Sequence, residues 1–421
     1  LNGASIQSVA GVAADLSGLT SADVKAVDGS TSAVLAVNGT LDGGMMASLS
    51  GRTLWLDATN LDGDATTTNP NNAASVGDGT NDWKDKDTGD AWAQTDASLR
   101  PTYSTSVANL GGLAGVTFTQ PATDTGVHLS NTGTLADMSG ASGFTWISVQ
   151  STASMNSLFA GHGNFTDFEA NTFYLENKGG SPGVPNTDML AMTWSGTDGA
   201  NTVYRDGMVF GTGTTDLDTG SSGFGTLNAN WATTDFAIGE RLWAPTRTLN
   251  GSVGEIVMFN RALTALEVQE VSTQLALKWG TDGTAVSAVG TAYDLSASTT
   301  STTLLAQRAK GTSSAESFVV AGADAVQAGG GNDTITLQDV ALRLVDGGAG
   351  LDTLKVGFTG TFDLSALVSN YTASTTGLHK LESIEKIDLT GDGSRVLVLT
   401  QADVLALSDN DTLIVQAKSG D

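Results

Sequence analysis

Two short stretches near the C-terminus combine closely spaced glycines with an aspartate, at a spacing that could bind a metal ion. They are residues 328–336 (AGGGNDTIT) and 347–355 (GGAGLDTLK). The second fits the nine-residue pattern G-G-x-G-x-D-x-U-x fully, and the first has Ala in place of the leading Gly; this pattern is typical of a calcium-binding β-roll. Its glycines permit tight turns, its turn carbonyls and carboxylate supply the hard oxygen ligands of Ca²⁺, and its apolar residue points into the core.

The candidate calcium ligands of this region are Asp324, Gly331, Asp333, Gly350 and Asp352. Asp324 belongs to a degenerate turn and lies nine residues before Asp333, whereas Asp352 lies nineteen residues after it, one more than two periods. A β-roll shares each calcium between turns, so this interrupted run predicts a short stub that holds one or two ions.

A second group of carboxylates lies in two loops near residues 60 and 80. Its candidate metal ligands are Asp62, Asp64, Asp78 and Asp82. Calcium takes about six to eight oxygens and accepts them from flexible loops of this kind. An EF-hand is excluded, because the Gly at its sixth position and the Glu at its twelfth are missing. The alternative is that these aspartates cap turns.

The charge balance favours bound cations over nucleic acid. Lys and Arg total 19 against 45 Asp and Glu, which gives a net charge of −26. Nucleic acids and anionic membranes reward basic residues, so we expect neither as a partner, whereas cations would relieve the repulsion. The chain has no cysteine and no apolar run of membrane-spanning length. With the calcium repeats, these features predict an extracellular bacterial protein whose export signal lies elsewhere.

Aromatic residues divide the chain into segments. All eight Trp and all six Pro lie between Trp55 and Trp279. Residues 51–280 consist of short alternating runs between Gly, Asn, Asp and Thr turns, which predicts an antiparallel β-sandwich. Residues 264–279 place Leu266, Val268 and Val271 at helical spacing after a Thr cap, which predicts an amphipathic helix closing this domain.

The two flanks, 1–50 and 281–421, share a similar segment. Residues 19–27 (LTSADVKAV) resemble residues 399–407 (LTQADVLAL), and each copy precedes an apolar run. Both copies predict a short helix with a Thr cap, then a turn and a strand. The flanks are therefore either two similar modules or one module split by the insertion of the aromatic domain.

The aromatic domain carries an ordered series of landmarks, at 54–64, 82–85, 100–102, 203–207 and 249–263. This series resembles that of bacterial laminin-G-like domains of the concanavalin-A-like lectin/glucanase superfamily. The resemblance implies an all-β jelly-roll of two antiparallel sheets with one C-terminal helix. It also implies Ca²⁺ at the rim and a glycan or protein ligand in the loops or on the concave face.

Residues in polar loops of this domain are candidates for ligand contact. They are Trp92, His162, Asn164, Trp194, Trp231, Arg241 and Trp243. A flat indole in a polar loop suits stacking on a sugar or a peptide side chain. For His162 the alternative is a solvated loop residue. Trp55, Trp146 and Trp279 lie in apolar patterns and are expected in the core.

Catalysis is not expected. Glucanases of the superfamily carry a Glu-x-Asp-x-x-Glu strand that brings two carboxylates to one face, and residues 51–280 contain no such strand. Ser-His-Asp hydrolysis also finds little support, because only two histidines, His128 and His162, lie within residues 51–280.

The C-terminal segment, with its calcium repeats followed by 362–364, 381–389 and 395–399, resembles a module of large repeats-in-toxin (RTX) adhesins. This resemblance implies a monomeric, calcium-dependent segment of a longer secreted adhesin that binds a cell-surface glycan or protein in adhesion or biofilm formation. A spacer without a ligand and a polysaccharide hydrolase are the alternatives.

Overall fold

The protein forms two compact units in a computed structural model. The sandwich unit contains Ser50–Thr264 and Lys278–Thr281, and the roll unit contains Leu1–Leu49, Ala265–Leu277 and Asp282–Asp421. The structure describes residues 6–7, 24–26, 31–36, 49–63, 75–119, 126–132, 135–155, 159–162, 172–175, 188–214, 225–227, 235–241, 244–297, 304–368, 380–408 and 412–418.

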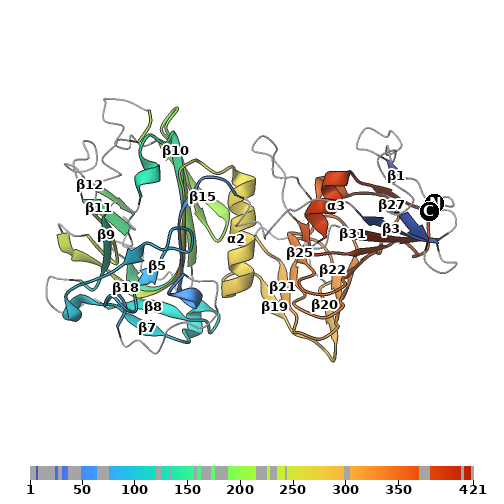
Figure 1. Ribbon diagram of the computed structural model, residues 1–421, viewed down its shortest axis with the longest axis horizontal. Coiled ribbons are helices and arrows are strands. Elements are labelled where there is room, and N and C mark those ends of the chain that lie inside the picture. The colour runs from blue at the N-terminus through green and yellow to red at the C-terminus, as the bar shows by residue number, and fades with distance from the viewer. Residues whose placement is uncertain are drawn as a thin grey trace. The chain divides into compact units, whose positions relative to one another are not determined.

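The sandwich unit is built from antiparallel sheets (Figure 1). The larger has the order β15 (Met208–Thr214), β14 (Ala200–Arg205), β13 (Asp188–Ser195), β10 (Gly143–Met155), β18 (Ala244–Phe259), β8 (Gly115–Phe118), β7 (Thr102–Ser104), with β4 (Arg52–Asp57) and β17 (Glu240–Arg241) also paired to β18. The smaller has the order β12 (Thr172–Leu175), β11 (Phe159–His162), β16 (Asp235–Ile238), β9 (Leu129–Thr132), and β5 (Trp83–Lys84) pairs with β6 (Ala91–Trp92). This architecture confirms the predicted all-β fold class.

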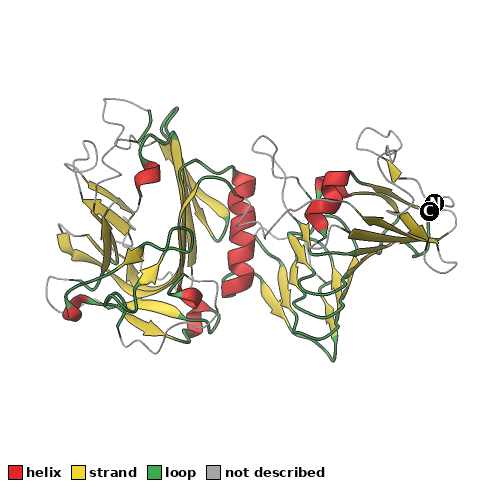
Figure 2. Cartoon of the chain, in the orientation of Figure 1, coloured by secondary structure: helices red, strands yellow, loops and turns green. Residues whose placement is uncertain are grey.

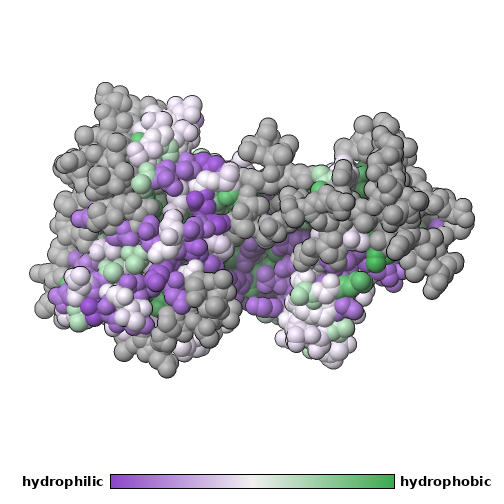
Figure 3. All heavy atoms as spheres, viewed as in Figure 1, coloured by the Kyte–Doolittle hydropathy of each residue, from purple (hydrophilic) through white to green (hydrophobic). Residues whose placement is uncertain are grey.

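Strand β10 shows why these residues form a sandwich. It pairs with β13 on one side and β18 on the other, and every residue from 143 to 150 is buried. Both of its faces are therefore covered, which favours its run of aromatic and β-branched residues. The described surface of this unit that faces the viewer in Figure 3 is largely hydrophilic.

The roll unit winds in parallel coils, each of which adds one strand to each of two sheets (Figure 2). The first sheet contains β19 (Thr284–Val286), β21 (Gln307–Lys310), β23 (Ala325–Gln327), β25 (Leu344–Asp346) and β28 (Leu381–Glu382). The second contains β20 (Ala292–Asp294), β22 (Ser317–Val320), β24 (Thr334–Leu337), β26 (Thr353–Val356), β29 (Lys386–Asp388) and β31 (Thr412–Ala417).

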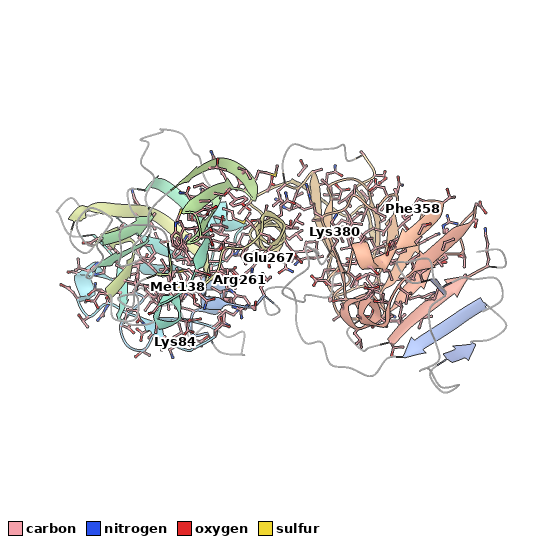
Figure 4. The ribbon with its side chains drawn as sticks, turned by 90° about the horizontal axis from the view of Figure 1, so that it is seen from above. Lys84, Met138, Arg261, Glu267, Phe358 and Lys380 are labelled. Carbon is pink, nitrogen blue, oxygen red and sulfur yellow. The ribbon has the colours of Figure 1, made fainter. Side chains whose placement is uncertain are left out.

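Apolar residues of the coils fill the roll. Ile335 and Leu354, the apolar positions of the two glycine repeats, are fully buried in a core that also includes Phe318. Phe358, labelled in Figure 4, packs edge-to-face on Phe362 with ring centroids 5.9 Å apart. The prediction of a short stub is wrong: five coils stack in parallel, because coils without the glycine pattern continue the same ladders.

The N-terminal segment belongs to the roll unit. β3 (Thr31–Ala36) pairs antiparallel with β31 and with β2 (Val24–Ala26), while β1 (Ile6–Gln7), β30 (Arg395–Val398) and β27 (Gly360–Asp363) form a parallel sheet. Residues 1–49 and 282–421 are thus parts of one unit, which is the split-module alternative. The helix predicted within 19–27 is wrong where the structure describes it, because residues 24–26 form a strand.

Two α-helices were anticipated by their sequence patterns. α3 (Gln401–Leu407) starts at Thr400 with a capping box to Asp403, as predicted. α2 (Ala265–Trp279) has the predicted bounds, but its residues 265–277 group with the roll unit and only Lys278 and Trp279 with the sandwich. Short 3-10 helices span Ala58–Asn60, Ala97–Leu99, Ala108–Leu110, Ala136–Met138 and Leu364–Ala366.

None of the helices in the described part of the chain has the length and apolarity needed to cross a membrane.

Candidate functional site

Four acidic residues stack along one edge of the roll. Each immediately precedes a strand of the second sheet, and the register Ser317↔Thr334↔Thr353↔Lys386 brings them into line. We call this set the acidic ladder; its members are Glu316, Asp333, Asp352 and Glu385. All four are buried, with at most 7% of any residue exposed.

Backbone hydrogen bonds link the rungs of the acidic ladder. The amide of Glu316 donates to Asp333 Oδ1 at 2.7 Å, and the amide of Asp333 donates to Asp352 Oδ1 at 2.7 Å. The amide of Asp352 in turn donates to Glu385 Oε2 at 2.8 Å. Each carboxylate from Asp333 onward therefore uses one oxygen to hold the preceding coil.

The second oxygens of the two aspartates lack partners. Asp333 Oδ2 and Asp352 Oδ2 are both buried and accept no hydrogen bond. Burial raises the pKa of Asp352 to about 7, with the charges of Glu385, Asp333 and Asp346 adding to the effect against the bond from the Asp333 amide. Burial also raises the pKa of Asp333. A buried unpaired acceptor is costly, so these oxygens favour a proton or a cation beside them.

Glycine turns surround the two aspartates as the repeats predict. Gly331 and Gly350 have φ angles of 108° and 152°, and a β-carbon on Gly350 would overlap the carbonyl oxygen of Gly331. The amide of Gly331 donates to the carbonyl of Ala349 in the next turn at 2.9 Å. Only glycine permits this approach, which stacks the turn backbones tightly.

The side chains and turns fit calcium better than a metal bound by side chains alone. Among the described residues, no three His, Cys, Asp or Glu side chains converge as a metal site. An ion at Asp333 or Asp352 would therefore draw most of its oxygens from turn carbonyls, which Ca²⁺ accepts readily. The two unpartnered carboxylate oxygens supply the charge that the carbonyls lack.

Asp324 lies away from the acidic ladder. It precedes β23 of the first sheet, whereas the ladder residues precede strands of the second. Its carboxylate accepts the amide of Ala321 at 3.0 Å and its carbonyl accepts the amide of Arg343. The nine-residue period thus alternates between the two edges and places Asp324 apart from Asp333 and Asp352. Its role as a calcium ligand stays a prediction.

Sequence reasoning missed the two glutamates of the acidic ladder. Their turns lack the glycine pattern, and Glu replaces Asp in both. The sequence does carry a signal for Glu316: like Asp333, seventeen residues later, it directly precedes an alternating apolar run. Glu385 is thirty-three residues after Asp352, so only the strand register reveals its place.

The predicted carboxylate site of the sandwich unit contains turn caps. Asp78 Oδ1 accepts the amides of Thr80 and Asn81 at 2.9 and 2.8 Å, bonds that lower its pKa, and Asp82 Oδ1 accepts the amide of Gly79 at 2.8 Å. These contacts match the turn-capping alternative. Asp62 Oδ1 is buried without a hydrogen bond, and Asp64 lies outside the described residues.

Two of the tryptophans predicted to contact ligand are in the core. Trp92 and Trp194 are fully buried: Trp92 pairs with Trp83 across β5 and β6, and Trp194 lies beside Phe144 with ring centroids 6.1 Å apart. Their rings offer no open face to a sugar, so this prediction is wrong for both. Trp146 and Trp279 are buried as expected, while Trp55 is half-buried.

Of the remaining ligand candidates, only His162 and Arg241 fall within the described residues, and the strands do not bring these two together. His162 pairs with Asp235 at the start of β16, whereas Arg241 follows the end of that strand, so they lie toward opposite ends of β11. The backbone of both residues is described, but their side chains are not. Asn164, Trp231 and Trp243 lie outside the described residues.

Two of the landmark segments, 54–64 and 249–263, meet the last residues of α2 in a buried charge network. Asp57 and Glu255 face each other across β4 and β18, and Lys278 Nζ lies 2.8 Å from Asp57 Oδ2 and 2.6 Å from Glu255 Oε2. The indole nitrogens of Trp55 and Trp279 each donate to Glu255 at 2.7 Å. Burial opposes the charge on Lys278, but the two carboxylates outweigh it and raise its pKa.

Comparisons with known proteins give similarity in structure alone. No family model matches the chain, and no curated protein does. Domain 4 of the extracellular arabinanase AbnA from Geobacillus stearothermophilus is 13% identical, with 53% of this chain and 98% of that chain covered and a TM-score of 0.33. A pentraxin from Limulus polyphemus is 15% identical over 38% of this chain and 81% of that chain, with a TM-score of 0.29.

A sialidase from Trypanosoma rangeli is also similar, at 14% identity and a TM-score of 0.30; the match covers 54% of this chain and 33% of the sialidase. At these identities and scores, the likenesses carry no argument about ligand or activity.

Proposed function

We propose that the chain is a calcium-stabilised segment of a secreted bacterial adhesin, in which the roll unit binds Ca²⁺ and the sandwich unit binds a glycan or protein. The observation that carries the proposal is the pair of buried, unpartnered oxygens on Asp333 and Asp352. Bound Ca²⁺ supplies the positive charge that these carboxylates lack.

The proposed ions would be held by Asp333 and Asp352 together with carbonyls of their glycine turns. Extracellular calcium modules bind with dissociation constants of about 10⁻⁴–10⁻³ M, so carbonyl-rich sites of this kind suit a calcium-rich exterior. The net charge of −26 supports the same interpretation, because bound cations reduce the self-repulsion of the chain.

The sandwich unit is proposed to bind ligand without catalysing a reaction. Its buried carboxylates Asp57 and Glu255 are both engaged by Lys278, which leaves neither positioned as a free acid or base. His128 is also engaged: its Nδ1 lies 3.0 Å from Glu240 Oε2 and its Nε2 lies 2.6 Å from the amide nitrogen of Gln94. This arrangement supports no Ser-His-Asp chemistry.

A structural spacer is the second candidate function. The burial of Trp92 and Trp194 favours it, because two of the four tryptophans predicted to stack on a ligand are packed in the core. A spacer would need calcium in the roll unit in the same way, so ligand binding by the sandwich is what separates the two functions.

Two measurements test the proposal. Calcium titration of the whole chain by calorimetry should show binding that is lost in the double variant D333N/D352N and kept in D392N, which changes a fully exposed acid of the same unit. No calcium binding by the wild-type chain would contradict the roll assignment. Glycan and peptide arrays probed with and without a chelator should reveal a calcium-dependent ligand; a folded chain that binds nothing on either array would favour the spacer.

A further inference from the structure

We propose that Glu385 is a calcium ligand that completes the site of Asp352 from a coil without any glycine repeat, and that Glu316 at the opposite end of the acidic ladder is not a ligand. The inference rests on the calcium binding proposed above. If Glu385 is a ligand, the calcium ion at Asp352 is held between a coil that carries the glycine repeat and a coil that lacks it.

Glu385 occupies the position in the acidic ladder where the next aspartate of a regular repeat would lie. Glu385 accepts the amide of Asp352 in the same way that Asp352 accepts the amide of Asp333. It is 2% exposed, and its charge is the first of the acidic charges that act on Asp352. Two buried carboxylates on adjacent rungs, one with an unpartnered oxygen, form a site for a divalent cation.

The backbone of the non-repeat coil supplies a further oxygen. A β-carbon on Gly347 would overlap the carbonyl oxygen of Ser383 and would lie 3.0 Å from Asp352 Oδ2. The carbonyl oxygen and the carboxylate oxygen are therefore within about 5 Å of each other, a gap that one ion with Ca–O distances of about 2.3–2.6 Å can bridge.

Ser383 has the backbone conformation that such a turn requires. Its φ angle is 55°, and among the described residues other than glycine only Asp206 shares a positive φ. Strained conformations of this kind persist where the surrounding structure demands them, often at binding sites. The turn from Ser383 to Glu385 is also three residues shorter than the turn from Gly347 to Asp352, so the longer Glu side chain compensates for missing turn carbonyls.

Glu316 shows the contrasting arrangement. Its Oε2 accepts the amide of Thr312 at 2.9 Å and its Oε1 accepts the Thr312 hydroxyl at 2.6 Å. Both oxygens are thus engaged by its own turn, which closes without a metal. The row of ions should therefore end at Asp333 on this side and extend to Glu385 on the other.

The test compares E385Q with its matched control E316Q in the whole chain, with Ca²⁺ alone as the probe. Calorimetry gives the affinities, and hydrogen exchange of residues 380–388 and 311–317 reports the two turns. We expect E385Q to weaken one calcium site at least tenfold and E316Q to leave every affinity within about twofold. E385D, which keeps the charge on a shorter side chain, should recover part of the lost affinity.

The outcomes separate the inference from the proposed function. If the wild-type chain binds no calcium, the proposed function fails. If D352N loses a site while E385Q binds as the wild type does, or if E316Q and E385Q weaken binding equally, the role of Glu385 is overturned and the roll assignment stands. If E385Q fails to fold, E385D decides: calcium-dependent protection of 380–388 at a higher calcium concentration supports the inference, and wild-type behaviour overturns it.

Discussion

Raising the pH in the absence of calcium should destabilise the roll unit. The carboxyl of Asp352 has a pKa of about 7 in the folded chain against 3.8 for an ordinary aspartate, so the folded state binds this proton more tightly than the unfolded state. The contribution to stability is fully present below about pH 4 and is lost as the pH rises through 7. Calcium should abolish this dependence, because it takes the place of the proton.

The rise in the pKa of Asp352 sets the size of the expected loss of stability. A pKa rise of about 3 units corresponds to about 4 kcal/mol at most. Solvent near the turns reduces this figure, because charges close to a protein surface are screened. We therefore expect the roll to lose about 2 kcal/mol between pH 5 and pH 8 when calcium is absent.

The assay uses the uneven distribution of tryptophan. All eight Trp belong to the sandwich unit, so their fluorescence reports its unfolding and serves as an internal reference. Hydrogen exchange of residues 317–356 reports the roll. Both signals are followed through urea unfolding at pH 5 and pH 8 in calcium-free buffer, and again with excess calcium.

Two variants make the result specific. D352N removes the group that carries most of the shift, so without calcium it should keep only the smaller pH dependence that the raised pKa of Asp333 contributes. D392N should behave as the wild type. The reasoning is refuted if D352N retains the full pH dependence, or if the calcium-free roll of the wild type is more stable at pH 8 than at pH 5.

Three further perturbations probe the units separately. G350A should destabilise the roll by about 2–3 kcal/mol, because its β-carbon would overlap the carbonyl of Gly331; G290A, with a φ of 72° in open space, should cost only about 1 kcal/mol in the same exchange measurement. K278M should lower sandwich stability by about 3 kcal/mol in the tryptophan signal, because it removes the cation between two buried carboxylates and leaves Asp57 with Lys86 alone, at 3.3 Å. T400A should cost about 1 kcal/mol in the roll through loss of the α3 cap.

Local patterns predicted the elements whose signals are local. The glycine repeats, the capped helix at 401–407 and the alternating strands of the sandwich all follow from residue spacing. The helix expected around residue 24 did not, although its sequence resembles that of the C-terminal copy, because pairing of Val24–Ala26 with β3 decides the conformation. Strand preference depends on such cross-strand partners more than on the residues themselves.

The site was less predictable because burial and register are set by distant residues. Trp92 and Trp194 have polar neighbours in the sequence, yet both are fully buried in the fold, Trp92 opposite Trp83 and Trp194 beside Phe144. Glu385 has no motif around it, and its place beside Asp352 depends on parallel pairing of β26 with β29. The glycine turns alone therefore predict too short a roll, and they give no sign of Glu316 and Glu385 at the two ends of the acidic ladder.

The two units neutralise buried carboxylates in opposite ways. In the sandwich unit, Lys278 is built into the fold between Asp57 and Glu255, so the network needs nothing from solution. In the roll unit, no described ion pair involves Asp333 or Asp352, and the nearest charges are acidic. We therefore expect their counter-charge to come from solution, because no described residue supplies it: a proton at low pH or a cation at high pH. The stability of the roll, unlike that of the sandwich, is therefore expected to depend on the composition of the surrounding solution.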